Sequence, residues 1–313
     1  MSSQNLKTNT GRRNQVHVVV RAEEKPRAFA PQPKLEILQP RPRSEFKLGW
    51  LPDVPDYRDH THETTSVRSM FKSAKPVKSS GLPPNVDLRQ WCSPIEDQEN
   101  IGSCTAHAVV GLVEYFQNRT QGEFLDASRL FLYKATRELY HSVGDTGAYI
   151  RGTIRALRLF GVCPEDYWSY NPRKFDEDPT SFCYAFGHNY KALTYYRLWD
   201  ADPAKLLDIL RGSLANELPF AFGFSVYSSI WDPEVQSTGK IPMPSPKDHL
   251  EGGHAIMAVG YDDDQQRLLI RNSWGTSWGD SGYGTLPYGY VENSMADDFW
   301  VLVSAEYVSL MGL

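Results

Sequence analysis

One cysteine of this chain lies at the predicted start of a helix, where a thiol can become a nucleophile. The stretch QENIGSCTAHAVVGLVEYFQ, residues 98–117, repeats apolar residues at steps of three and four, as on a buried helix face. Gly102 and Ser103 supply a turn and a candidate N-cap just before Cys104. Unpaired backbone N–H groups and the positive end of the helix dipole meet there. We therefore expect Cys104 to favour the thiolate, which is the nucleophilic form.

A nucleophilic thiol needs a base, and the base needs a group that orients it. His254 lies in EGGHAIMAVGYD, where HAIMAVGY has the pattern of a buried strand. Asn272 ends another apolar run, LLIRN. Gln98 lies six positions before the cysteine, so its side-chain amide and the backbone N–H of Cys104 are candidate donors to a developing oxyanion.

The elements that must position these residues change in kind along the chain. Apolar periodicity predicts helices in the first part and mainly strands after residue 190, which indicates an α+β fold with a helical lobe and a β lobe. Asp126 is a predicted N-cap for the second helix, and Asp202 with Pro203 for the last. After the cysteine-bearing helix, the predicted helices are 128–139, 148–160 and 204–214, and the predicted strands are 191–199, 219–227, 254–262, 266–272, 283–291 and 298–304.

Composition limits the class of protein. The 313 residues are 41% hydrophobic and 23% charged, which is typical of a globular protein, and no apolar run approaches the ~20 residues of a membrane span. Arginines on the predicted helix 148–160 are interpreted as a solvated face, so we expect no nucleic acid as a partner. We also expect no membrane partner and a monomeric protein. The amino terminus has no signal-peptide pattern, which favours the cytoplasm or export by another route.

Residues 1–81 differ from the remainder in charge and composition. They carry 15 Lys and Arg against 8 Asp and Glu, while the whole chain has a net charge of −5, so the remainder is acidic. Opposite charges favour docking of this extension on the body. The segment FKLGWLPDVPDYRDHT, residues 46–61, has too many large apolar groups for a solvating tail. We hypothesise that this segment lies on the body, near the cleft that would hold the reacting groups. Removal of the extension would then require cleavage of the chain in the linker 72–81.

The four cysteines do not suggest a metal site. None forms a C-x-x-C pair, so we expect no metal and no cofactor. Besides Cys104, the cysteines are expected to be buried or free thiols. A bridge between Cys163 and Cys183 is the alternative if the protein is exported.

From Leu82 to the carboxyl terminus, the chain resembles the papain-like cysteine peptidases, which share the order Cys, His, Asn. The motifs are LPPNVDLRQW, the Gln98/Cys104 pair, GVCPEDYWSYNP, GGHAIMAVGYD and RNSWGTSWGDSGYG. Ile101 stands where the family commonly has a disulfide cysteine, and Thr105 where it has an aromatic residue. These departures indicate a distant, microbial branch. The amino-terminal extension lacks the long helical pattern of the cathepsin extensions.

The resemblance implies a two-lobed α+β fold and an endopeptidase. Residues 1–81 would be an inhibitory propeptide that docks on a catalytic domain, 82–313, whose helical lobe is mainly 82–195 and whose β lobe is mainly 196–313. Peptides or proteins would be the substrates, through a thioester on Cys104. Two alternatives remain, a silent papain-fold binding module and a transpeptidase or ligase. The implied catalytic residues are Cys104, His254 and Asn272, with Gln98 and the Cys104 N–H at the oxyanion. The implied substrate-binding residues are Gly147, Gly223, Ala255 and Trp274. The small residues Gly223 and Ala255 would leave room for a bulky apolar side chain of the substrate.

Overall fold

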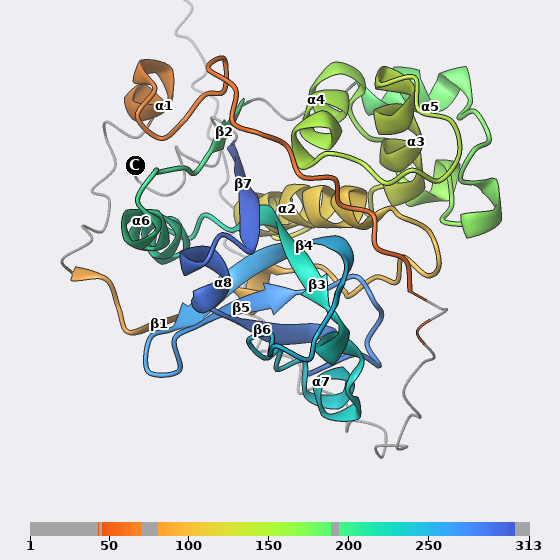
Figure 1. Cartoon of the computed structure of the whole chain (residues 1–313). Coiled ribbons are helices and arrows are strands. Elements are labelled where there is room, and N and C mark those ends of the chain that lie inside the picture. Colours follow the sequence, from red (N-terminus) through yellow and green to blue (C-terminus); the bar gives the residue numbers. More distant parts are fainter. Residues whose placement is uncertain (1–42, 44–45, 71–80, 189–193, 304–313) are drawn as a thin grey trace, which may run out of the picture. The chain divides into compact units, whose positions relative to one another are not determined.

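The computed structural model describes residues 43, 46–70, 81–188 and 194–303 (Figure 1). Residues 39–313 form one compact unit, and residues 1–38 lie outside the described ranges. The helices are α1 (Thr65–Met70), α2 (Cys104–Gln121), α3 (Arg129–Leu139), α4 (Ile150–Phe160), α5 (Ser181–Gly187), α6 (Pro203–Ala215), α7 (Pro233–Thr238) and α8 (Gly289–Glu292), with short 3-10 turns including η6 (Ser228–Trp231). The strands are β1 (Asn85–Asp87), β2 (Thr194–Arg197), β3 (Phe220–Tyr227), β4 (Leu250–Asp262), β5 (Arg267–Arg271), β6 (Tyr283–Pro287) and β7 (Ala296–Val303).

The strands form one antiparallel sheet in the order β2-β7-β3-β4-β5-β6, with β1 paired to β4. His254 on β4 pairs with Phe224 on β3, and Met257, further along β4, pairs with Arg271 on β5. Asn272 follows β5 directly. The sheet therefore carries the histidine and the asparagine on adjacent strands, as their separate sequence settings require.

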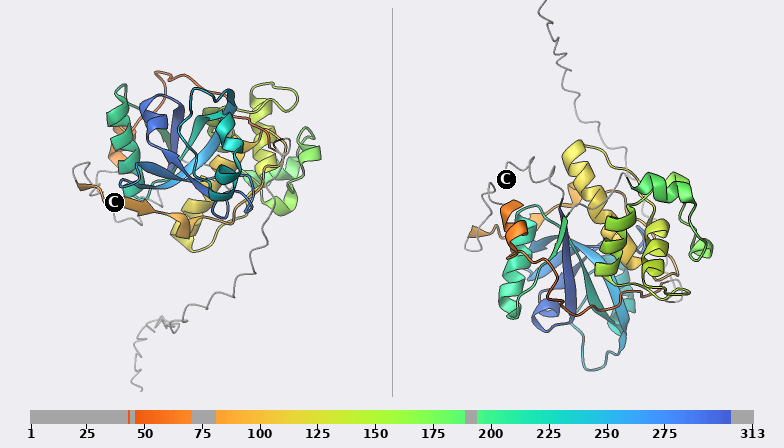
Figure 2. Two further views of the ribbon diagram at one scale, coloured as in Figure 1. Left: turned by 60° about the horizontal axis from the view of Figure 1, so that its bottom comes forward. Right: turned by 90° about the horizontal axis from the view of Figure 1, so that it is seen from above.

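Helix α2 runs between the sheet and the helices α3 and α4 (Figures 1 and 2). Other elements cover this helix on several sides, so every residue from Cys104 to Leu112 is buried. The buried surface of the helix is therefore wider than the single apolar stripe predicted from the sequence. Glu114, further along the helix, is buried too. The helix ends at Gly122, whose φ of 75° needs the left-handed conformation that glycine adopts freely.

The predicted class, α+β with helices first and a sheet afterwards, is confirmed, and the Asp202 cap is confirmed by a bond from the Ala204 N–H. Other local predictions were wrong. Ser128 caps α3 by accepting from the Phe131 N–H, because the chain enters the helix two residues after Asp126. The predicted strand 283–291 ends at Pro287, and a short helix, α8, follows it. Helix α4 begins at Ile150 rather than at residue 148, because Ala148 bonds outside the helix.

Candidate active site

Cys104 begins α2 and is fully buried. The backbone N–H groups of Ala255, on β4, and of Gly49, from the amino-terminal extension, act on its sulfur and lower the pKa of the thiol. Ser103 holds the N-cap position but makes no side-chain cap, because its hydroxyl bonds the Tyr170 hydroxyl at 2.7 Å instead. The helix, the sheet and the extension therefore meet at the thiol.

His254 and Asn272 form a hydrogen-bonded pair. The Nε2 atom of the histidine lies 2.8 Å from Oδ1 of the asparagine, and both side chains are buried. The other ring nitrogen, Nδ1, has no hydrogen-bond partner among the described residues. Ala255 follows the histidine, and its backbone N–H lowers the pKa of the Cys104 thiol, so His254 and Cys104 lie in the same part of the structure.

Aromatic rings cover the histidine. Trp274 is fully buried and stacks on His254 with ring centroids 4.7 Å apart, while Trp278 meets Trp274 edge-on at 5.7 Å. Outward from the His254–Asn272 pair, Trp231 stacks on Trp274 at 5.6 Å. The rings keep water away from the His254–Asn272 bond and fix the plane of the imidazole.

The side-chain amide of Gln98 is already occupied. Its Nε2 donates to the backbone carbonyls of Lys47 and Ile101, both at 2.9 Å, and its Oε1 accepts from Ser273 Oγ at 2.7 Å. The Tyr170 hydroxyl fixes the Gln98 backbone by donating to its carbonyl at 2.8 Å. A carbonyl of the extension thus lies against the donor that the sequence assigns to an oxyanion.

The extension crosses the site as an extended strand, which we call the cleft segment (residues 46–52). On one side the Ala148 N–H donates to the Gly49 carbonyl at 2.8 Å, and the Leu51 N–H donates to the Ala148 carbonyl at 3.0 Å. On the other side the Trp50 N–H donates to the Gly253 carbonyl at 3.0 Å. The cleft segment is therefore bonded to both lobes through its backbone.

Gly147 lies beside this strand with a φ of 74°, and a Cβ there would overlap the Gly49 carbonyl. The backbone bonds that the sequence analysis associated with Gly147 run through Ala148, one residue later, while the Gly147 N–H donates to the Tyr133 hydroxyl. Gly147 thus provides the close approach, and its neighbour provides the hydrogen bonds.

Trp50 fills the space above Gly223. A Cβ on Gly223 would overlap the indole, and Gly253 also contacts it closely. Ala255 pairs with Gly223 across β3 and β4, beside the thiol. These small residues do leave room for a large ring, but the indole N–H donates to Asp298 Oδ2 at 3.2 Å. The space therefore has an apolar wall and a polar acceptor.

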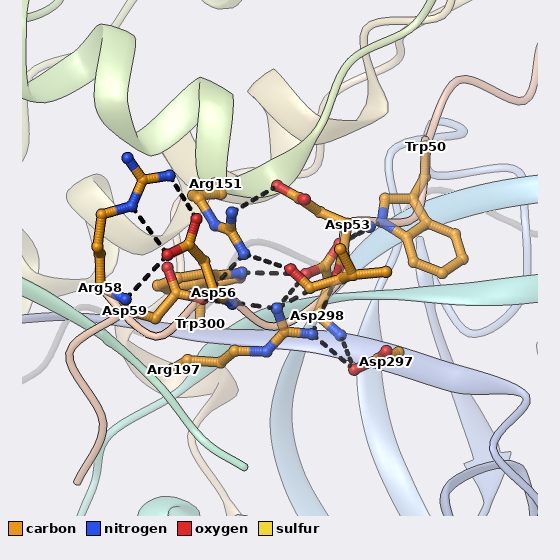
Figure 3. A network of polar contacts seen from close by, with 11 residues as sticks. Trp50, Asp53, Asp56, Arg58, Asp59, Arg151, Arg197, Asp297, Asp298 and Trp300 are labelled. Carbon is orange, nitrogen blue, oxygen red and sulfur yellow. Dashed lines mark hydrogen bonds and ion pairs between the residues drawn. The ribbon is translucent and has the colours of Figure 1, made fainter.

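Asp298 is the centre of a buried polar network (Figure 3). Its Oδ2 also accepts from the Asp53 N–H at 2.9 Å, and its Oδ1 lies 3.2 Å from the guanidinium of Arg197. Asp298 has a φ of 63°, which is strained for a residue other than glycine and turns the chain within β7. Burial raises the pKa of Asp298 to about 6, although Arg197 opposes this change.

The chain after the cleft segment, residues 53–70, is an anchor segment. Arg151 on α4 pairs with Asp59 at 2.8 Å (Figure 3), and Thr61 extends the sheet by a bridge to Arg197 on β2. Val67 is buried within the hydrophobic core. The anchor segment thus packs as part of the same compact unit as the body, whereas residues 71–80, which include all of the linker but Gly81, lie outside the described residues.

Burial, rather than the helix terminus, controls the protonation of the site. It raises the pKa of the Cys104 thiol to about 11, against the smaller lowering effects of the Ala255 and Gly49 N–H groups. Burial also lowers the pKa of His254 to about 4. The expected thiolate is therefore wrong for this state, because the cleft segment excludes the water that would stabilise the charges.

Sequence reasoning missed several groups around the site. Asp298 carries no local motif. Ser273 lies in RNSWGTSWGDSGYG, Lys47 in FKLGWLPDVPDYRDHT and Tyr170 in GVCPEDYWSYNP, but these motifs alone assign none of the three a role. All four cysteines are free, and three of them are buried. Within the described ranges, no cluster of His, Cys, Asp or Glu could hold a metal ion, and no helix is long and apolar enough to cross a membrane.

Comparison with known proteins defines the class. A sequence profile described as papain family cysteine protease matches residues 82–300. A peptidase C1-like protein of Acanthamoeba polyphaga mimivirus is 33% identical over 270 residues, which are 82% of this chain and 86% of that protein. Chicken cathepsin K (Gallus gallus) is 28% identical over 66% of this chain and 60% of its own length.

Solved structures agree with the sequence matches. Xylellain, a cysteine protease from Xylella fastidiosa, is 37% identical, with a TM-score of 0.70 over 84% of this chain and 98% of its own. A digestive procathepsin L 3 from Tenebrio molitor shares the fold at 21% identity, with a TM-score of 0.57 over 76% of this chain and 78% of its own. The papain-like two-lobed fold is thereby confirmed. This chain belongs to the papain family of cysteine proteases, and it resembles microbial members of that family.

Proposed function

We propose that this protein is a cysteine endopeptidase made as a zymogen, with residues 1–81 as its inhibitory extension and 82–313 as its catalytic domain. The observation that carries the proposal is the Lys47 carbonyl at the Gln98 amide, beside the buried Cys104 thiol and the His254–Asn272 pair. A peptide carbonyl is thus bound where a substrate carbonyl has to react.

In this proposal, Nδ1 of His254 takes the proton of Cys104 once the cleft segment has left. The thiolate attacks the substrate carbonyl, and the oxyanion accepts from Gln98 Nε2 and the Cys104 N–H. His254 then returns the proton to the leaving amine, which breaks the C–N bond and leaves a thioester on the sulfur. Water activated by His254 hydrolyses the thioester. Asn272 orients the ring throughout.

The direction of the cleft segment explains why it would resist cleavage. In a substrate, the half that stays on the sulfur is amino-terminal to the scissile bond, so the leaving half lies toward the general acid His254 and its cover Trp274. Here Phe46, on the amino-terminal side of Lys47, packs against Trp274 with ring centroids 4.8 Å apart and the rings tilted by 42°. Trp50 and Ala148 pair in parallel on the other side. The segment therefore runs opposite to a productive substrate, and the amine after Lys47 points away from the acid.

The test is incubation of the full-length protein at mildly acidic and at neutral pH. Peptide hydrolysis should appear together with displacement or loss of part of residues 1–81, which mass spectrometry monitors. Cys104→Ala should abolish hydrolysis. Hydrolysis that persists in Cys104→Ala would refute the proposed nucleophile, and full activity with the cleft segment still protected would refute the zymogen.

A further inference from the structure

The rings of His254, Trp274 and Trp231 form a row that we call the aromatic platform, and the carboxylate of Glu251 lies at its outer end. Glu251 is on β4, three residues before His254, and its side chain is only 4% exposed. Trp231 stacks on Trp274, which stacks on His254. The platform leads from the catalytic histidine toward the primed side of the cleft, where the leaving half of a substrate lies, so this carboxylate is within reach of residues after the scissile bond.

The extension places a cation there. The guanidinium of Arg43 pairs with Glu251 Oε2 and lies over the Trp231 ring, 5.8 Å from its centroid. The other carboxylate oxygen, Oε1, lies 3.0 Å from Nε2 of His249 but makes no hydrogen bond among the described residues, so the guanidinium is paired with Oε2. A carboxylate combined with an aromatic face is a recognition site for a basic side chain.

The site extends into open space. Trp231 and Glu251 border a hollow of about 500 Å³ together with four residues of the extension, Arg43, Phe46, Lys47 and Leu48. Phe46 stacks on Trp231 at 5.7 Å, so an aromatic contact lies next to the charged one. Arg43 itself is more than half exposed, so a substrate residue can reach the same carboxylate once the extension moves.

We infer that Trp231 and Glu251 form a primed-side subsite that selects substrates with an arginine or lysine within the first three residues after the scissile bond. The inference rests on the proposed peptidase function and adds a substrate class to it. Arg43 uses the subsite in the resting protein. The Phe46 N–H donates to the Arg43 carbonyl at 3.2 Å, so Arg43 lies next to Phe46, and an extended substrate reaches the subsite with no more residues than the extension uses.

The first experiment needs no peptidase activity. In the full-length protein, alkylation of Cys104 by iodoacetamide measures how often the cleft segment opens. Arg43→Ala and Glu251→Gln should each raise the alkylation rate severalfold, and the double variant should be no faster than either single one. Asp264→Asn, in the exposed turn after β4, removes the same charge and should change nothing. Additive effects in the double variant would overturn the pairing.

The second experiment measures selectivity after activation of the full-length protein. Matched peptides carry arginine or its neutral isostere citrulline at each of the first three primed positions. At one position, kcat/KM should be about tenfold higher for arginine, and Glu251→Gln should bring the ratio near one. Cleavage without an arginine preference, or a ratio unchanged in Glu251→Gln, overturns this inference alone. Absence of any cleavage by the wild type would instead refute the proposed function.

Discussion

Gln98 donates its side-chain amide to the backbone carbonyl of Lys47 across 2.9 Å, so one residue both holds the extension and is the proposed oxyanion donor. Gln98→Ala should therefore lower the activity of the activated protein and, in the full-length protein, make the Cys104 thiol more accessible. In activated protein kcat/KM should fall by about 10²- to 10³-fold, the usual cost of an oxyanion donor. In full-length protein Cys104 alkylation should become about two- to tenfold faster, because one hydrogen bond is lost. Lost activity without faster alkylation would show that this bond does not help to hold the extension.

Gly49 should be needed for docking of the cleft segment. A Cβ at this position would overlap the Gly102 backbone carbonyl, which cannot move aside as a side chain can. Gly49→Ala should lower the free energy needed to open the cleft segment by about 1–3 kcal/mol. This change should make Cys104 alkylation roughly 10- to 100-fold faster. Gly81→Ala is the matched control, because nothing lies within 4 Å of its Cβ position. Equal rates in the two variants would contradict the docked path.

Trp50 contributes both packing and a hydrogen bond, which two variants separate. Trp50→Ala should weaken docking by about 3–5 kcal/mol, as expected for a buried indole. Trp50→Phe keeps most of the ring but leaves Asp298 without its indole donor, so we expect a smaller loss, about 1–3 kcal/mol. Hydrogen–deuterium exchange of residues 46–52 measures both. A Phe variant as open as the Ala variant would place the whole effect in the hydrogen bond.

Acid should loosen the cleft segment through His254. Burial lowers the pKa of His254 to about 4 from 6.5, so docking is fully favoured above pH 6.5 and weakens as pH falls toward 4. The opening equilibrium should rise roughly a hundredfold by pH 4. Asp298, whose pKa burial raises to about 6, acts in the opposite direction to the extent that docking buries it.

Hydrogen–deuterium exchange of the Gly49 and Trp50 amides, corrected for the intrinsic effect of pH, measures this opening. His254→Gln should flatten the profile between pH 4 and pH 6.5, and Asp298→Asn should steepen it. Exchange in the wild type that does not change over this range would exclude His254 as the titrating group.

Glu114 should stabilise the helical lobe. It is fully buried, lies 2.7 Å from the Arg129 guanidinium and accepts from the Ala127 N–H at 3.1 Å. Glu114→Ala leaves a buried guanidinium without its main partner, which should cost about 3–5 kcal/mol and lower Tm by about 10 °C. Glu123→Ala, an exposed change just after the same helix, is the control. A Tm loss no larger than in that control would show that Arg129 finds compensation from Asp126 and Glu96.

The sequence predicted the α+β class because the helical and strand periods are strong on either side of residue 190. It also predicted the adjacency of His254 and Asn272, since each ends or lies in a distinct apolar run. The path of residues 46–52 was only a hypothesis, because a Pro-punctuated segment has no period that fixes its contacts. The protonation of Cys104 could not be predicted, because a local helix terminus competes there with burial by a distant segment. Asp298 has no sequence signal, since its role depends on a strained turn within β7.

The orientation of the cleft segment has a consequence for ligand design. A synthetic copy of residues 43–53 would occupy the groove and survive in it. Such a peptide would inhibit the proposed peptidase through its backbone direction, with no chemical change at the bond next to Cys104.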